Sequence, residues 1–216
     1  MRVVRARQTH RESTPQQVTG ETAATRSRHS LNGLPPLIGT TPYANSPIQF
    51  GHPAGASYAL RMSEALIEAA VDLLDDSLAA VRAAIAGAPL EALEWRPPAE
   101  DANPLVVLAV HAMHSTRWWL SVATGAEMPE RDRPSEFLAT ATDPDELRSF
   151  LDRMSSECRV LLASAERFDP AATWTSSTDG EVVTRGWALL HALEHLREHA
   201  AQALLTRQLW VHAHPD

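Results

Sequence analysis

Apolar residues recur with the period of an α-helix along most of the chain beyond residue 62. The pattern predicts four long helices, at about 63–86, 103–124, 143–167 and 187–209. Helices of this length joined by loops predict an all-α protein, an antiparallel four-helix bundle.

Residues at the expected helix ends support two of these boundaries. Asn103 with Pro104, and Asp143 with Pro144, each place a capping side chain directly before a proline suited to the first helical position. The loop at 173–186, between the last two helices, contains an Asp-Gly turn signal, which fits a short hairpin and an irregular loop equally well.

The first 61 residues differ from the rest in pattern and composition. They contain many Pro, Ser, Thr and Gln residues and no sustained apolar period. Such a segment buries too little apolar surface to offset the entropy lost on ordering. We therefore predict a disordered tail at 1–61, or a translation start at Met62, followed by the bundle at 62–210 and a short C-terminal tail at 211–216.

Charge separates the same two segments. Residues 1–61 carry seven Arg and two Glu, a net charge of +5, whereas residues 62–216 carry twelve Arg and 25 acidic residues, a net charge of −13. A folded part this acidic repels phosphates, so we expect no nucleic-acid partner. A single cysteine, Cys158, fits a reducing compartment, and the longest apolar run, at 105–110, is too short to span a bilayer. We expect a soluble, cytoplasmic protein.

Three histidines on the last predicted helix have a spacing that can bind a metal ion. His191, His195 and His199 are four residues apart, so successive rings are neighbours on the helix surface. His199 borders the apolar face and His195 comes next, whereas His191 has rotated towards the polar side. His195 and His199 are therefore the better inward-facing pair.

The second predicted helix offers a third ligand, His111. Its first half is apolar almost all round and is therefore buried, and a buried histidine needs a partner for each ring nitrogen. We predict a divalent metal bound by His111, His195 and His199. Imidazole ligands suit zinc, nickel, iron or copper better than magnesium or calcium, and zinc is the first choice on availability. Histidines that are simply core or rim residues stay open as the alternative.

Several short motifs occur in an order that resembles the DinB/YfiT-like superfamily of metal-binding four-helix bundles. These are Trp95-Arg96-Pro97, Asn103-Pro104, His111 followed by Arg117-Trp118-Trp119, and the segment Glu194–Gln202. The resemblance covers about residues 62–210. It places the metal ligands at His111, His195 and His199, with Gln202 as the glutamine that follows the last ligand. Ala200-Ala201 stand where the family often has Arg-Gly.

The resemblance also implies a chemistry. Relatives use mycothiol or bacillithiol, which are small thiols, to act on electrophilic substrates as S-transferases or isomerases, and they are commonly homodimers. On this basis we expect Gln202, Trp118, Trp174 and Glu198 around the metal, as neighbours of the ligands or as pocket walls.

Other metal classes fit the sequence less well. His191, Glu194 and His195 match the H-x-x-E-H signature of inverted zinc proteases, but only 21 residues follow His195, too few for the rest of such a site. A di-iron bundle needs Glu-x-x-His, and no helical histidine here has a Glu three positions before it. A thiol-dependent transferase or isomerase is our main expectation. A metal-dependent hydrolase and a non-catalytic binding bundle are the alternatives.

Overall fold

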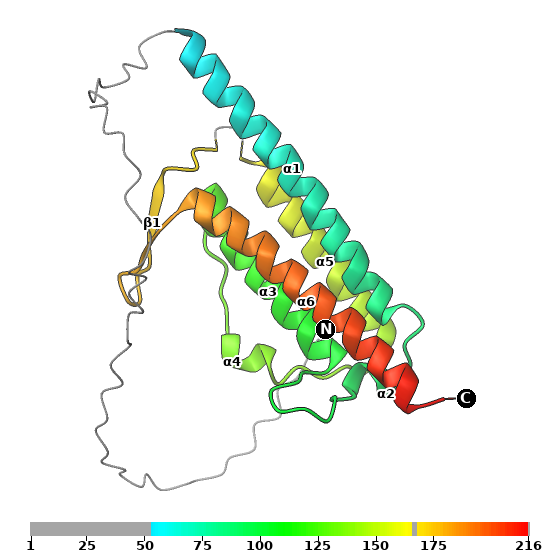
Figure 1. Cartoon of the computed structure of the whole chain (residues 1–216). Coiled ribbons are helices and arrows are strands. Elements are labelled where there is room, and N and C mark those ends of the chain that lie inside the picture. The colour runs from blue at the N-terminus through cyan, green and yellow to red at the C-terminus, as the bar shows by residue number, and fades with distance from the viewer. Residues whose placement is uncertain (1–52, 166–167, 216) are drawn as a thin grey trace, which may run out of the picture. The chain divides into compact units, whose positions relative to one another are not determined.

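The computed structural model describes residues 53–165 and 168–215, and this part of the chain is mostly helical. The long helices are α1 (Pro53–Ile85), α3 (Leu105–Thr124), α5 (Pro144–Ala163) and α6 (Arg185–Ala213). Two short helices, α2 (Leu90–Glu94) and α4 (Arg133–Glu136), lie in the connections on either side of α3. The predicted all-α four-helix bundle is confirmed (Figure 1).

The four long helices form two layers, and two helices run in each direction. Helix α3 packs against α5 and α6, and α1 packs against the same two helices. Helices α1 and α6 run one way along the bundle, and α3 and α5 run the other way (Figure 1). Because α3 and α5 share a direction, the chain between them has to return along the bundle. That returning segment carries α4 back beside the middle of α3, where it contributes to the site.

Helix α3 is the central element of the core. Every residue from 105 to 113 is buried, as expected for a segment that is apolar all round. Helix α5 is amphipathic instead, and it turns Leu147, Leu151, Met154, Cys158 and Leu162 inward at intervals of three and four residues. Burial of these stripes is the main source of stability for the bundle.

The helix ends agree with the sequence in one case and differ in others. Asp143 caps α5, accepting a hydrogen bond from the Asp145 amide, as predicted. The cap of α3 is Pro104 rather than Asn103, because the Asn103 side chain is used elsewhere: its Oδ1 accepts a 3.4 Å hydrogen bond from Arg96. Sequence patterns fix helix ends only to within a few residues, since capping groups have competing partners.

The first and last long helices, α1 and α6, are longer than predicted, and α5 is shorter. Helix α1 begins at Pro53 rather than near Ser63, so residues 53–61 are helical although the pattern placed them in a tail. Helix α6 reaches Ala213 instead of ending near Leu209, and α5 ends at Ala163. Residues 1–52 lie outside the described part of the chain, so the disorder predicted for them stays a prediction.

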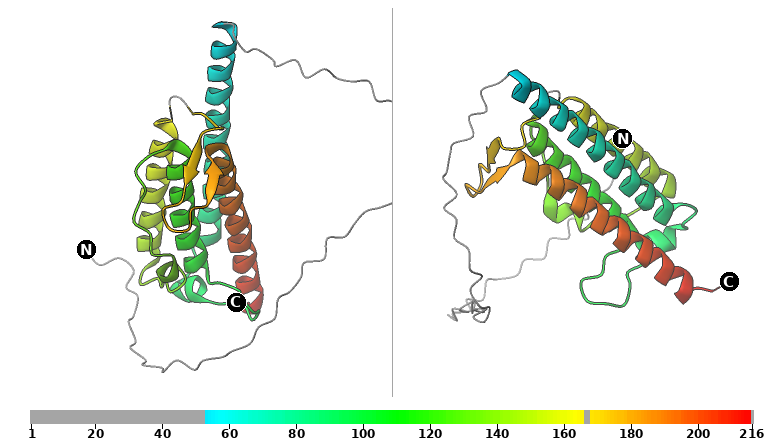
Figure 2. Two further views of the ribbon diagram at one scale, coloured as in Figure 1. Left: turned by 90° about the vertical axis from the view of Figure 1, so that its left-hand side faces the viewer. Right: turned by 45° about the horizontal axis from the view of Figure 1, so that its top comes forward.

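A two-stranded hairpin precedes α6, which decides between the two readings of this loop. Strands β1 (Thr173–Thr175) and β2 (Val182–Thr184) pair antiparallel, with Trp174 opposite Val183. Gly180 has a φ of 75°, a left-handed conformation that glycine adopts without strain. The hairpin lies at the end of the bundle where α6 starts (Figure 2). Among the described residues, no helix has the length and hydropathy required to span a membrane.

Candidate metal centre

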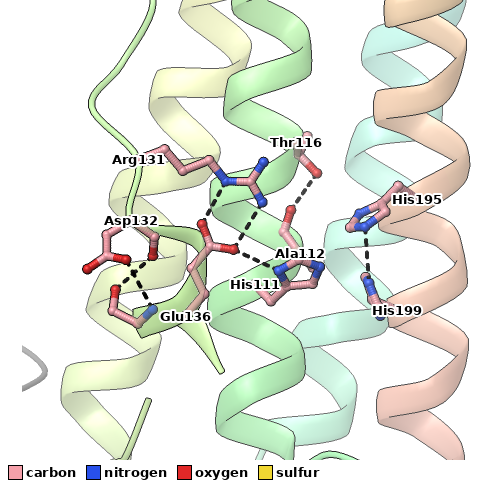
Figure 3. A network of polar contacts seen from close by, with 9 residues as sticks. His111, Ala112, Thr116, Arg131, Asp132, Glu136, His195 and His199 are labelled. Atoms are coloured by element: carbon pink, nitrogen blue, oxygen red, sulfur yellow. Dashed lines mark hydrogen bonds and ion pairs between the residues drawn. The ribbon is translucent and has the colours of Figure 1, made fainter. Parts of the chain in front are cut away.

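Three histidines from two helices meet between α3 and α6. His111 comes from α3, and His195 and His199 come from consecutive turns of α6 (Figure 3). One nitrogen from each ring lies within 4.8 Å of the others, and Nε2 of His195 is 3.3 Å from Nε2 of His199. The structure thus brings together the three residues that the sequence selected.

His111 is held by a buried carboxylate. Its Nδ1 lies 2.7 Å from Oε2 of Glu136, and the two side chains are only 6% and 3% exposed. Arg131 binds the same carboxylate through two hydrogen bonds, from Nε to Oε1 at 2.7 Å and from Nη2 to Oε2 at 3.0 Å. Phe137 packs against the His111 ring with a centroid distance of 4.5 Å. The imidazole therefore has little freedom to rotate.

The protonation of this pair follows from its surroundings. Burial by itself would raise the pKa of Glu136, but hydrogen bonds from His111 and Arg131 outweigh it, and the pKa is lowered. An ionised carboxylate only accepts hydrogen bonds, so the proton between the two residues belongs to Nδ1 of His111. Nε2 of His111 then faces the cluster, and in the neutral ring it presents a lone pair to it.

His199 is oriented by neutral and more exposed groups. Its Nδ1 lies 2.7 Å from Oε1 of Gln202, and Nε2 of Gln202 donates to Oε1 of Glu198 at 3.2 Å. Because the Gln202 amide donates to a carboxylate on one side, its oxygen is left to accept from Nδ1 of His199. Nε2 of His199 therefore also presents a lone pair to the cluster.

His195 completes the cluster and has no such support. Its Nδ1 is buried and has no hydrogen-bond partner among the described residues. Burial, with smaller contributions from His199 and His111, lowers the pKa of His195 to about 3. The ring is thus neutral at pH 7, which is the form that binds metals. Burial lowers the pKa of His199 as well.

This arrangement fits a tetrahedral metal ion. Two nitrogens bound to one such ion at about 2.0–2.1 Å are about 3.3–3.4 Å apart, close to the 3.3 Å between His195 and His199. The neutral rings of His195 and His199, and the orientation of each ring by a partner on its far side at His111 and His199, are features of metal ligands.

The other candidate residues lie at different places. His191 is stacked on Trp187 at 4.6 Å and meets the edge of Trp119 at 4.9 Å, and it is not part of the cluster. Gln202 and Glu198 lie beside the cluster as described above. Trp118 and Trp174 are half-buried against the core, and their role as pocket walls stays a prediction.

Glu136 and Arg131 are the residues that the sequence did not reveal. The available local signal is Asp132, whose side chain accepts from the Ser135 amide and caps α4 with Pro134 in the first turn. That signal predicts a short helix, but it does not say which element the helix faces. The contact with His111 depends on the return of the chain along α3, which is a property of the tertiary structure.

A cavity of about 380 Å³ opens beside the cluster. His199 and Gln202 form part of its wall, together with residues of the 97–103 loop and the last turns of α6. A second cavity of about 300 Å³ lies on the other side of Glu136 and is lined by His114, Arg131 and Arg153 among others. Burial lowers the pKa of His114.

The fold and the site together define a helical bundle with a three-histidine, metal-type cluster. Residues 73–203 match the sequence profile of the DinB superfamily, and the chain belongs to this superfamily. A crystal structure described as the conserved protein of a locus from Enterococcus faecalis is similar in fold, with a TM-score of 0.54 and 15% identity, over 67% of this chain and 96% of that chain. No curated protein matches the sequence.

Proposed function

We propose that this protein binds one divalent metal ion through Nε2 of His111, His195 and His199. The observation that carries the proposal is the convergence of these nitrogens, two of which have their protons fixed on the opposite side of the ring by Glu136 and Gln202. Zinc is our first candidate, with nickel and iron as further candidates, because imidazole ligands suit these ions. The superfamily supports the same assignment.

An enzyme is a better fit than a structural metal site. Among the described residues the cluster contains three candidate ligands and no fourth. The nearby carboxylate of Glu136 already bonds to His111 and Arg131, and that of Glu198 bonds to Gln202. Structural zinc sites have four protein ligands, whereas catalytic sites keep a position open.

The nucleophile would have to come from a small molecule. The single cysteine, Cys158, is fully buried on α5, and burial raises its pKa to about 12, so it supplies no thiolate near pH 7. A metal held by the cluster would stabilise a bound thiol as thiolate or lower the pKa of a bound water towards about 7. Resemblance to thiol-dependent relatives favours the first option. We propose an S-transferase or isomerase that uses a mycothiol-type thiol and an electrophilic substrate.

The chain's own residues have clear parts in this proposal. Glu136 and Arg131 hold the His111 ring, Gln202 holds His199, and the cavity beside His199 has room for the reactants. A homodimer and a cytoplasmic location stay proposals that rest on the resemblance and the composition. Sedimentation of the purified protein tests the first of these.

Cobalt substitution tests the thiol proposal directly. Titrating the cobalt protein with mycothiol, bacillithiol and glutathione should produce a sulfur-to-metal charge-transfer band with at least one thiol. No band with any of them, together with metal-dependent cleavage of esters or amides, would assign the protein to the hydrolases. Metal binding without either signal would indicate a non-catalytic binding bundle.

A further inference from the structure

The cavity beside His199 has a wall with a distinct chemistry. Its apolar part is formed by Pro97, Ala99, Ala102, Leu108, Leu205 and Leu209. Its polar part contains Glu100, Asp101, Asn103, Gln202 and Thr206. Apart from His199, these lining residues include no basic side chain. Any group that enters the cavity therefore meets apolar surface and two carboxylates.

Nearby groups do not reverse this charge. Nη1 of Arg96 donates to the Ala102 carbonyl and to Oδ1 of Asn103, so this guanidinium braces the 97–103 loop from its own side. Glu198 adds a third carboxylate next to the cavity through its bond with Gln202. Three carboxylates thus lie in or next to the cavity wall against one guanidinium, that of Arg96, so the charges around the cavity are net negative.

One polar group in the wall is available for recognition. Thr206 lines the cavity and is only 6% exposed. Its hydroxyl can both donate and accept a hydrogen bond, so a ligand with a hydroxyl or amide group at this depth can pair with it. The Asp101 backbone has a φ of 61°, and the Asn103 amide donates to its carbonyl at 3.5 Å, which fixes the loop that bears the carboxylates.

We propose that this cavity receives the part of the thiol or substrate that lies beyond the reacting atom, and that it accepts an uncharged or positively charged group and disfavours a carboxylate. This inference rests on the proposed metal site. It separates the two ends of the ligand: the reacting atom is drawn to the metal as an anion, while the rest of the ligand must be free of negative charge. Hydroxyl groups on an apolar body would match Thr206 and the leucines.

Metal-directed probes test the inference without relying on thiol chemistry. Hydroxamic acids with one common chain, ending in a carboxylate, a carboxamide or an ammonium group, are titrated into the zinc-loaded protein by calorimetry after its metal content has been measured. We expect the carboxylate probe to bind about twofold to tenfold more weakly than the other two. The difference should narrow as salt is added, because the carboxylates are solvent-exposed.

A double variant and a matched control locate the effect. Glu100→Gln with Asp101→Asn should abolish the difference, and asparagine tolerates the left-handed conformation of residue 101. Glu68→Gln with Asp72→Asn removes two exposed charges from α1, away from the cavity lining, and should preserve the difference. Equal affinity for all three probes, tighter binding of the carboxylate, or no binding to metal-loaded protein overturns this inference alone. A protein that takes up no metal overturns the proposed function as well.

Discussion

The α3 side and the α6 side of the histidine cluster orient their ligands in different ways. On the α3 side, His111 is buried and bonded to an ionised Glu136, which Arg131 holds in turn. On the α6 side, His199 relies on the exposed amide of Gln202, and the buried Nδ1 of His195 has no partner among the described residues. The ligand on the α3 side is positioned by a buried charged group, and the two ligands on the α6 side are positioned mainly by their four-residue spacing on one helix.

This difference predicts how strongly each residue supports metal binding. Hydrogen bonds to charged groups are roughly twice as strong as neutral ones, and they weaken with exposure to water. Support on the α3 side should therefore matter more than support on the α6 side, although each side contributes indispensable ligands.

The largest expected effect is loss of a ligand. His111→Ala and His195→Ala should each abolish stoichiometric metal binding, because two imidazoles are left to hold the ion, whereas the natural protein should bind about one ion per chain. Elemental analysis after dialysis provides the measurement. His191→Ala is the matched control from α6 and should keep its metal, since His191 packs against Trp119 and Trp187. Loss of metal from His191→Ala with retention in His199→Ala would favour the inverted protease motif.

The next effect concerns the support of His111. Glu136→Gln keeps the shape of the side chain but removes its charge, so it should weaken zinc affinity by about 10-fold to 100-fold. Competition with a chromophoric chelator measures this affinity. Glu130→Gln, which changes an exposed neighbour on the same loop, should have little effect. Equal affinities for Glu136→Gln and the natural protein would show that the α3 side is not positioned by charge.

The two sides should also respond to acid in different pH ranges. In the chelator-treated protein, folding lowers the pKa of His195 from 6.5 to about 3. Between these two values the unfolded chain binds a proton at His195 and the folded chain does not. The free energy of unfolding therefore falls as the pH drops from 6.5 towards about 3. Glu136 has a lowered pKa, so its contribution is complete above about pH 4.5 and is lost below that value.

Urea unfolding across this pH range separates the two contributions. His195→Gln should reduce the loss of stability that begins near pH 6.5, without removing it, because the pKa values of His199 and His114 are lowered too. Glu136→Gln should change the slope only below about pH 4.5. If both variants altered the same range, the two sides would not be electrostatically distinct.

The comparison also explains which parts of the site could be predicted from the sequence. His195 and His199 share a face through local helix geometry, and His111 lies in a segment that is apolar almost all round and therefore buried, so local patterns nominate all three as candidate ligands and leave core or rim histidines as the alternative. Helices α3 and α5 likewise follow from their apolar stripes. Such features depend on residues that are close in sequence.

Glu136 could not be predicted in the same way, because its contact with His111 depends on the path of the chain between α3 and α5. The sequence could not decide between a hairpin and an irregular loop before α6, because an Asp-Gly turn fits both. The predicted start of α1, near Ser63, was wrong because the apolar pattern is weak in the segment that follows Pro53, where the helix begins. Long-range contacts and weakly patterned ends are where propensities give least information.

A smaller effect is expected from the support on the α6 side. Gln202→Ala removes the acceptor for Nδ1 of His199, but this hydrogen bond is neutral and exposed, so zinc affinity should fall by only about twofold to tenfold. The chelator competition used for Glu136 measures it. Gln208→Ala, a glutamine on the exposed surface of α6, is the control and should leave affinity unchanged. A loss as large as that of Glu136→Gln would remove the difference between the two sides.

The smallest effect is the coupling between the two supports. Glu136 and Gln202 bond to different histidines on different helices, so each fixes only its own ring. The affinity losses of Glu136→Gln and Gln202→Ala should then add in the double variant to within about 0.5 kcal/mol. If the double variant lost much less binding free energy than the sum of the two single losses, then misplacing one ligand would already disturb the others, and the three ligands would be positioned cooperatively. Agreement with the sum would mean that α3 and α6 present independently positioned ligands, which the rigid packing of the two helices makes the expected result.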